Sequence, residues 1–256
     1  MHAQAFTIAR FTLLEAIRTR LPLVVVAVFA LIWAASYFVH QISITESARL
    51  QSSFFAAAAR LASVFMLALY ITSSMAREFN EKGLELVLAL DLPRSSYLIG
   101  KLAGFIAVGM IIALAAALPL AAYAPPSVAL TWAASLALEL AIVCAASLFC
   151  IVTFNQVFAA VTLVAGFYLL ARSITAMRLM AESSILGSLA DARPLLSFGV
   201  EALAYLVPPL DRFSATEWIA ARVVEPYVLG PIVVQSAVFV ALLLGATMID
   251  FYRREI

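Results

Sequence analysis

Charged residues are scarce in this chain. They make up 12% of its 256 residues, whereas soluble domains carry about 25%. Hydrophobic residues make up 65%, and the mean hydropathy is +1.05. This composition excludes an ordinary soluble domain and indicates an integral membrane protein. The net charge of +1 comes with no basic patch, so we expect no nucleic-acid partner.

Cysteine and histidine are almost absent, with two of each. Cys144 and Cys150 lie in one apolar run, where a helix would separate their Cα atoms by ~9 Å, beyond the reach of a disulfide. We expect both to pack as small apolar side chains. His2 and His40 provide no set of metal ligands, so we expect no metal site.

Catalytic and nucleotide-binding motifs are also missing. The pair Gly100-Lys101 is followed by leucine and lacks the upstream glycine of a phosphate-binding loop. Neither H-E-x-x-H nor G-x-S-x-G occurs. We therefore expect a non-catalytic chain without a cofactor of its own.

Six apolar runs dominate the chain, at about 21–39, 54–76, 98–122, 128–152, 157–170 and 227–251. A helix of about 20 residues crosses a bilayer, and open sheet cannot satisfy its backbone in lipid. The sequence predicts an all-α polytopic membrane protein, with residues 1–256 as a single transmembrane domain. Residues 4–20 alternate apolar and charged positions without a cleavage site, so we expect a retained interfacial helix.

The connections between the runs differ in kind. Residues 124–127 and 154–156 predict tight turns after the third and fourth runs. The segment 172–226 is long and partly apolar. It is expected to form either short helices that dip into the outer leaflet or an amphipathic helix that lies flat on it, and both readings stay open.

Lysine and arginine near the ends of the runs indicate the orientation. We expect both termini in the cytoplasm, because the N-terminal arm, the loop after the second run and the C-terminal tail are all basic. That side would carry nine basic residues: Arg10, Arg18, Arg20, Arg77, Lys82, Arg94, Lys101, Arg253 and Arg254. The other side would carry seven: Arg49, Arg60, Arg172, Arg178, Arg193, Arg212 and Arg222.

The fourth run contains a carboxylate near its middle. Alanines 133, 137, 141 and 145 form one stripe of a helix, and Glu139 and Ser135 lie on the opposite face. A charge at that depth costs about 2.5–3.5 kcal/mol, so Glu139 needs a partner or water. Two readings stay open: Glu139, Arg60 and Ser135 line a translocation path, or Glu139 pairs with Arg60 for structural reasons.

Two further features are expected to be structural. Arg172 lies at the outer end of the fifth run, where a long side chain can extend to the lipid headgroups. Gly100 and Gly104 form a small-xxx-small pair, which is typical of close helix packing in membranes.

The most informative segment is the charged island, residues 77–101, between the second and third runs. It holds eight charged residues: Arg77, Glu78, Glu81, Lys82, Glu85, Asp91, Arg94 and Lys101. Its middle, residues 84–90, is apolar enough to bind a soluble partner.

The charged island resembles the cytoplasmic loop of permease subunits of type-2 ATP-binding-cassette exporters. The resemblance lies in an acidic stretch, a glycine, Leu-Glu-Leu-Val-Leu-Ala-Leu, then Pro-Arg and Tyr-Leu-Ile-Gly-Lys. A Val-Pro-Pro-Leu-Asp-Arg-Phe stretch at 207–213 makes the copper-enzyme maturation permeases the nearest group. Two departures are Lys82-Gly83 in place of Gly-Thr, and Asp91 in place of a proline.

The resemblance implies a short coupling helix within residues 77–97 that inserts into a separate ATP-binding subunit, which would bind ATP and magnesium. The matching positions are Glu78, Glu81, Gly83, Glu85, Leu86, Leu88, Arg94 and Lys101. It further implies a bacterial-type inner membrane, a second permease copy or a related permease, contact with membrane lipid, and export of an unidentified substrate.

One alternative from a different class stays open. A membrane scaffold or assembly factor could dock a soluble partner through the same island without transport. A channel is less favoured, because no run shows a repeated polar stripe.

Overall fold

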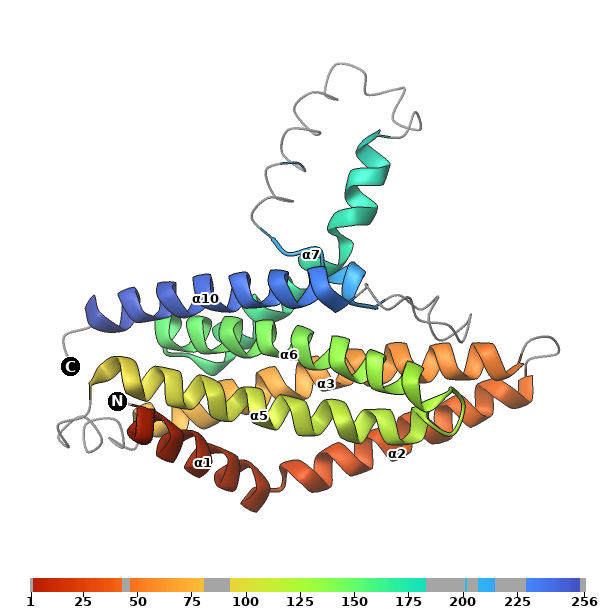
Figure 1. Ribbon diagram of the computed structural model, residues 1–256, viewed down its shortest axis with the longest axis horizontal. Coiled ribbons are helices and arrows are strands. Elements are labelled where there is room, and N and C mark those ends of the chain that lie inside the picture. The colour runs from red at the N-terminus through yellow and green to blue at the C-terminus, as the bar shows by residue number, and fades with distance from the viewer. Residues whose placement is uncertain are drawn as a thin grey trace.

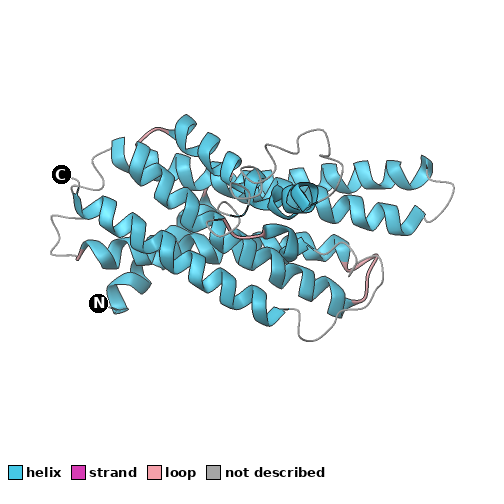
Figure 2. Cartoon of the chain, turned by 90° about the horizontal axis from the view of Figure 1, so that it is seen from above, coloured by secondary structure: helices cyan, strands magenta, loops and turns pink. Residues whose placement is uncertain are grey.

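The computed structural model describes residues 2–42, 47–80, 93–182, 201, 207–214 and 229–253 (Figure 1). Within these ranges the chain is helical and contains no strand (Figure 2). The α-helices are α1 (His2–Arg18), α2 (Leu21–Ile42), α3 (Ser47–Asn80), α5 (Arg94–Leu120), α6 (Pro126–Phe154), α7 (Val157–Glu182) and α10 (Leu229–Arg253). A short 3-10 helix, η2 (Leu210–Ser214), precedes α10.

Six of these helices are long and apolar enough to cross a membrane: α2, α3, α5, α6, α7 and α10. The predicted all-α fold with six spans is therefore confirmed. The fifth predicted run was drawn too short, because α7 continues to Glu182 and includes the first residues of the predicted outer segment. In Figure 1 the far end of α7 leaves the bundle. Of the predicted outer segment 172–226, only residues 172–182, 201 and 207–214 are described, so most of that prediction lies outside the described residues.

Both chain ends lie at the same end of the bundle, which we call the termini end (Figure 1). The last turn of α3 and the first turn of α5 also lie there, so the described flanks of the charged island belong to this end. Residues 81–92, which hold the centre of the predicted coupling helix, lie outside the described residues.

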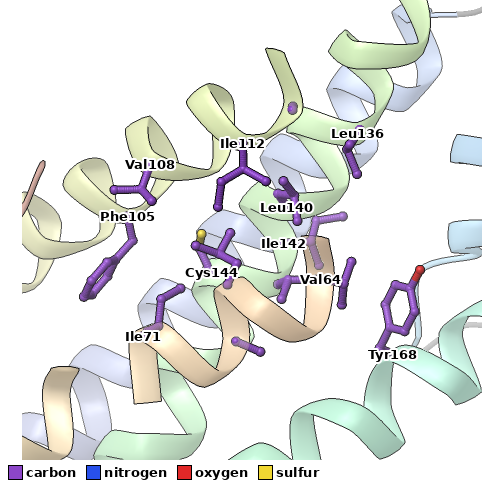
Figure 3. Close-up of a cluster of buried hydrophobic side chains, with 14 of the residues drawn as sticks. Val64, Ile71, Phe105, Val108, Ile112, Leu136, Leu140, Ile142, Cys144 and Tyr168 are labelled. Carbon is purple, nitrogen blue, oxygen red and sulfur yellow. The ribbon is translucent and has the colours of Figure 1, made fainter. Parts of the chain in front are cut away.

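Helix α6 is the centre of the bundle. It contacts α3, α5, α7, α10 and η2, and most of its residues are buried, whereas few residues of α2 and α10 are buried. Figure 3 shows apolar side chains of α3, α5 and α7, including Ile71, Phe105 and Tyr168, gathered around α6 side chains such as Leu140. Cys144 and Cys150 are free and buried, as predicted. Ala133 and Ala145 of the predicted stripe are buried, but so is the opposite polar face.

Helix α1 packs along the first half of α5. The contact depends on the predicted glycine pair: a Cβ atom on Gly104 would lie 2.6 Å from Cβ of Thr12, and one on Gly100 would lie 2.8 Å from Cβ of Ile8. Lipid provides no hydrophobic driving force between helices, so this close approach is what favours association. The glycine pair is thus a packing site, as the sequence indicated.

Both tight turns lie where the sequence predicted them. Pro125 precedes α6 and Pro126 opens it, a position where proline needs no amide hydrogen bond. Asn155 ends α6 in the left-handed conformation, with φ of 53°, and its N–H donates to the carbonyl of Ile151. The two turns set α6 antiparallel to α5 and α7, which brings Glu139 opposite α3 and α7.

Candidate functional site

A group of charged and aromatic side chains meets at one depth inside the bundle; we call it the buried charge cluster. Its members are Arg60, Trp132, Ser135, Glu139, Tyr168 and Arg172. Glu139 lies 15 residues before the end of α6 and Arg172 lies 15 residues after the start of α7, which puts each about 22 Å from the termini end. The cluster therefore lies about halfway along both α6 and α7.

Arg60 and Glu139 form the core of the cluster. Arg60 Nη1 donates to Glu139 Oε2, and the two side chains are 1% and 0% exposed. Arg60 Nη2 donates to Ser135 Oγ at 2.9 Å, and Ser135 donates in turn to the carbonyl of Trp132. The guanidinium of Arg60 also lies 5.1 Å from the ring centroid of Trp132, a cation–π contact. The structure thus contains the pair that one reading of the sequence expected.

Arg172 joins this pair from α7. Its Nη1 lies 3.5 Å from Glu139 Oε1 and 3.3 Å from the hydroxyl of Tyr168. The prediction that Arg172 extends to the headgroups is wrong, because the carboxylate inside the bundle attracts the guanidinium more strongly than a distant surface does. Its side chain is still 31% exposed, so the cluster is closed on the Arg60 side and partly open on the Arg172 side.

The cluster carries an excess of positive charge. Two guanidinium groups share one carboxylate, which leaves a formal charge of +1 among these residues. An ion pair held away from water pays a large desolvation cost and gives little net stability. An arrangement of this kind, with one unbalanced and partly open arginine, can attract an anionic group. That the cluster lines a translocation path stays a prediction.

Sequence reasoning found Arg60, Ser135 and Glu139 but missed Tyr168 and Trp132. One signal was available: Tyr168 and Arg172 are four residues apart, so a helix puts them on one face. That face could be matched to Glu139 only after the turn at Asn155 fixed how α7 lies against α6.

A second set of charges lies at the termini end. Glu78 at the end of α3 binds Lys101 of α5 at 2.5 Å, with side chains 19% and 8% exposed. Glu15 of α1 accepts hydrogen bonds from Arg77 at 3.0 Å and from Ser74 at 3.1 Å. We call these contacts the termini-end brace, because they tie α1, α3 and α5 together on both flanks of residues 81–92.

The predicted coupling residues divide into two groups. Glu78, Arg94 and Lys101 are described, and the structure joins Glu78 to Lys101. The other five, Glu81, Gly83, Glu85, Leu86 and Leu88, lie outside the described residues. A cavity of about 250 Å³ lies beside the brace; it is lined by Ile8, Phe11, Thr12, Glu15, Glu78, Tyr97 and Lys101.

Comparison with protein-family models finds no match, and comparison with curated proteins finds none either. The function must therefore be argued from the chain itself. Three features of the chain bear on its function: six long apolar helices, the buried charge cluster and the termini-end brace.

Proposed function

We propose that this chain is the membrane-spanning permease subunit of an ATP-binding-cassette transporter, which exports a substrate while a separate subunit hydrolyses ATP. One observation carries the proposal: the two helices that flank the charged island are tied to each other by Glu78 and Lys101 and to α1 by Glu15. A loop whose bases are held this firmly can pass a push from a partner to the spans.

The braced helices lead directly to the buried charge cluster. Helix α3 carries Arg60, and α5 packs against α6, which carries Glu139. A displacement of α3 and α5 by a partner at the termini end therefore changes the relation between Arg60 and Glu139. Coupling of this kind travels through rigid helices that have two packed arrangements.

The experiment begins with the island itself. In the complete complex, the double variant Leu86→Glu/Leu88→Glu places charge on its apolar stretch and is expected to remove the bound ATP-binding subunit. The control is Tyr252→Glu, an exposed residue of α10 at the same end. Retention of the ATPase with unchanged hydrolysis in the double variant contradicts the proposal. A copurifying protein without a nucleotide site favours the scaffold.

A second measurement tests the cluster as part of the path. Arg172→Gln removes the partly exposed guanidinium and leaves the Arg60–Glu139 pair, so folding is expected to be retained. Substrate-stimulated ATP hydrolysis is expected to fall several-fold. Arg178→Gln, on an exposed turn of the same helix, is the control. Unchanged stimulation in Arg172→Gln argues against a path at this cluster.

A further inference from the structure

We infer that the groove between the α1–α2 elbow and α3 binds one anionic phospholipid from the leaflet at the termini end. The groove is a cavity of about 310 Å³. Its lining residues are Thr19, Arg20, Leu21, Val24, Met66, Leu69, Tyr70, Ser73 and Arg77. The inference does not depend on the proposed function, since it rests on these residues alone.

Both walls of the groove change from polar to apolar in the same direction. Along α3, away from the termini end, the wall runs from Arg77 through Ser73 and Tyr70 to Leu69 and Met66. These positions follow at intervals of one to four residues and lie on one helix face. From Arg77 to Met66 the wall is about 16 Å long, close to the depth of one leaflet of a 30 Å hydrocarbon core.

The opposite wall repeats this order. Thr19 and Arg20 form the elbow, and Leu21 and Val24 follow on α2 as it enters the apolar zone. A phospholipid has the same arrangement, with a phosphate at the water and acyl chains below it. The groove is smaller than a whole lipid, so it holds the headgroup and the upper chains, and the exposed Val24 and Leu69 meet the rest.

The positive charge of the groove favours a lipid with an anionic headgroup. Among the residues that the structure describes, the groove is lined by two guanidinium groups and by no carboxylate. Arg77 donates to Glu15 through Nη2 and can use its other N–H donors for a ligand. Arg20 is exposed and forms no ion pair with any residue the structure describes. The Tyr70 hydroxyl is buried in the same groove. It can donate to a phosphate oxygen.

Two other cavities lined by described residues support no separate lipid site. The cavity beside Leu13, Val25 and Ile112 is almost wholly apolar and does not select a headgroup. The cavity beside Glu78 and Lys101 belongs to the termini-end brace already described.

The test titrates the detergent-purified full chain with phosphatidylglycerol or phosphatidylcholine and counts bound lipid by native mass spectrometry. Wild type is expected to retain one phosphatidylglycerol and to bind phosphatidylcholine much more weakly. Each of Arg20→Gln and Arg77→Gln is expected to weaken phosphatidylglycerol about fivefold, and the double variant about 25-fold. Arg18→Gln, an exposed arginine outside the groove, is the matched control and is expected to change little.

Two further arms separate the sources of the effect. Glu15→Gln breaks the ion pair but keeps Arg77, so lipid binding is expected to hold or to strengthen. Soluble glycerol phosphate has the headgroup charge without chains, and it is expected not to displace the lipid. Equal retention of both lipids, an unaffected Arg20→Gln variant, or displacement by glycerol phosphate would each overturn the inference. Arg20→Gln breaks no ion pair with a described residue, so it keeps the test valid if the double variant does not fold.

Discussion

The Arg60–Glu139 pair of the buried charge cluster and the Arg77–Glu15 pair of the termini-end brace join the same chemical groups in opposite surroundings. Arg60 and Glu139 are 1% and 0% exposed, whereas Arg77 and Glu15 are 52% and 35% exposed. Removing one partner from an enclosed pair leaves an uncompensated charge in a medium that cannot solvate it, while water takes over the lost contact at a surface. The same substitution should therefore cost very different amounts in the two regions.

The comparison also shows what holds α1 in place. Its ion pair with Arg77 is open to water, but its contact with Gly100 and Gly104 is too close for any side chain larger than glycine without movement. We therefore expect the close packing against α5 to stabilise the position of α1 more than its ion pair with Arg77 does. Four substitutions test whether burial and close packing set the cost of losing these contacts.

Arg60→Met should have the largest effect. It removes the main partner of a fully buried carboxylate, and breaking such a pair costs about 3–5 kcal/mol. The measurement is the free energy of unfolding of the purified chain in an SDS titration. The double variant Arg60→Met/Glu139→Gln is expected to recover most of the loss, since Arg172 can still reach water. A double variant as unstable as the single one would show that charge burial is not the cause.

Gly104→Ala should come second. Its Cβ would lie 2.6 Å from Cβ of Thr12, so α1 must shift, and overpacking of this kind costs about 1–3 kcal/mol. Reaction of a cysteine at Ala16, which is buried, with a water-soluble maleimide reports the shift. Gly166→Ala is the control, since its Cβ would meet nothing within 4 Å. Equal labelling in both variants would contradict the packing argument.

Lys101→Met should come third. It leaves Glu78 without its ion-pair partner in a partly enclosed place, and we expect a loss of about 1–2 kcal/mol. Under the proposed function it also weakens ATP-driven transport. The exchanged pair Glu78→Lys/Lys101→Glu is expected to restore stability. If Lys101→Met is as stable as wild type and the exchanged pair is not, the Glu78–Lys101 contact does not hold the two helices together.

Arg77→Gln should have the smallest effect, because exposed ion pairs contribute about 0.2–1 kcal/mol and are screened by salt. The free energy of unfolding, measured at low and high salt, should differ from wild type only at low salt. A large loss that persists at high salt would place this pair in the same class as the buried one.

The sequence predicted the spans well because each span is a local property. Apolar runs such as 128–152 must be helical in lipid, and prolines and Asn155 mark where they turn. It failed at the end of α7, where it predicted Arg172 as the outer end of the fifth run although the helix continues to Glu182. Hydropathy cannot show that a charge points inward.

The candidate site was only partly predictable for a related reason. Glu139 was found because a carboxylate in an apolar run is costly, and Arg60 was found as a charge at similar depth. Which face of α3 and α7 meets that carboxylate depends on contacts between residues 79 and 33 positions apart in the chain. One sequence without its fold contains no measure of those distances.

Six apolar helices and one charged island can be read from the residues alone, because a backbone in lipid must satisfy its own hydrogen bonds within each helix. Only the tertiary structure decided which charges meet. The packing of the helices places Arg172 beside Glu139 and Lys101 beside Glu78, and it leaves the groove between Arg20 and Arg77. Those outcomes depend on how whole helices fit together, which no local run of residues specifies.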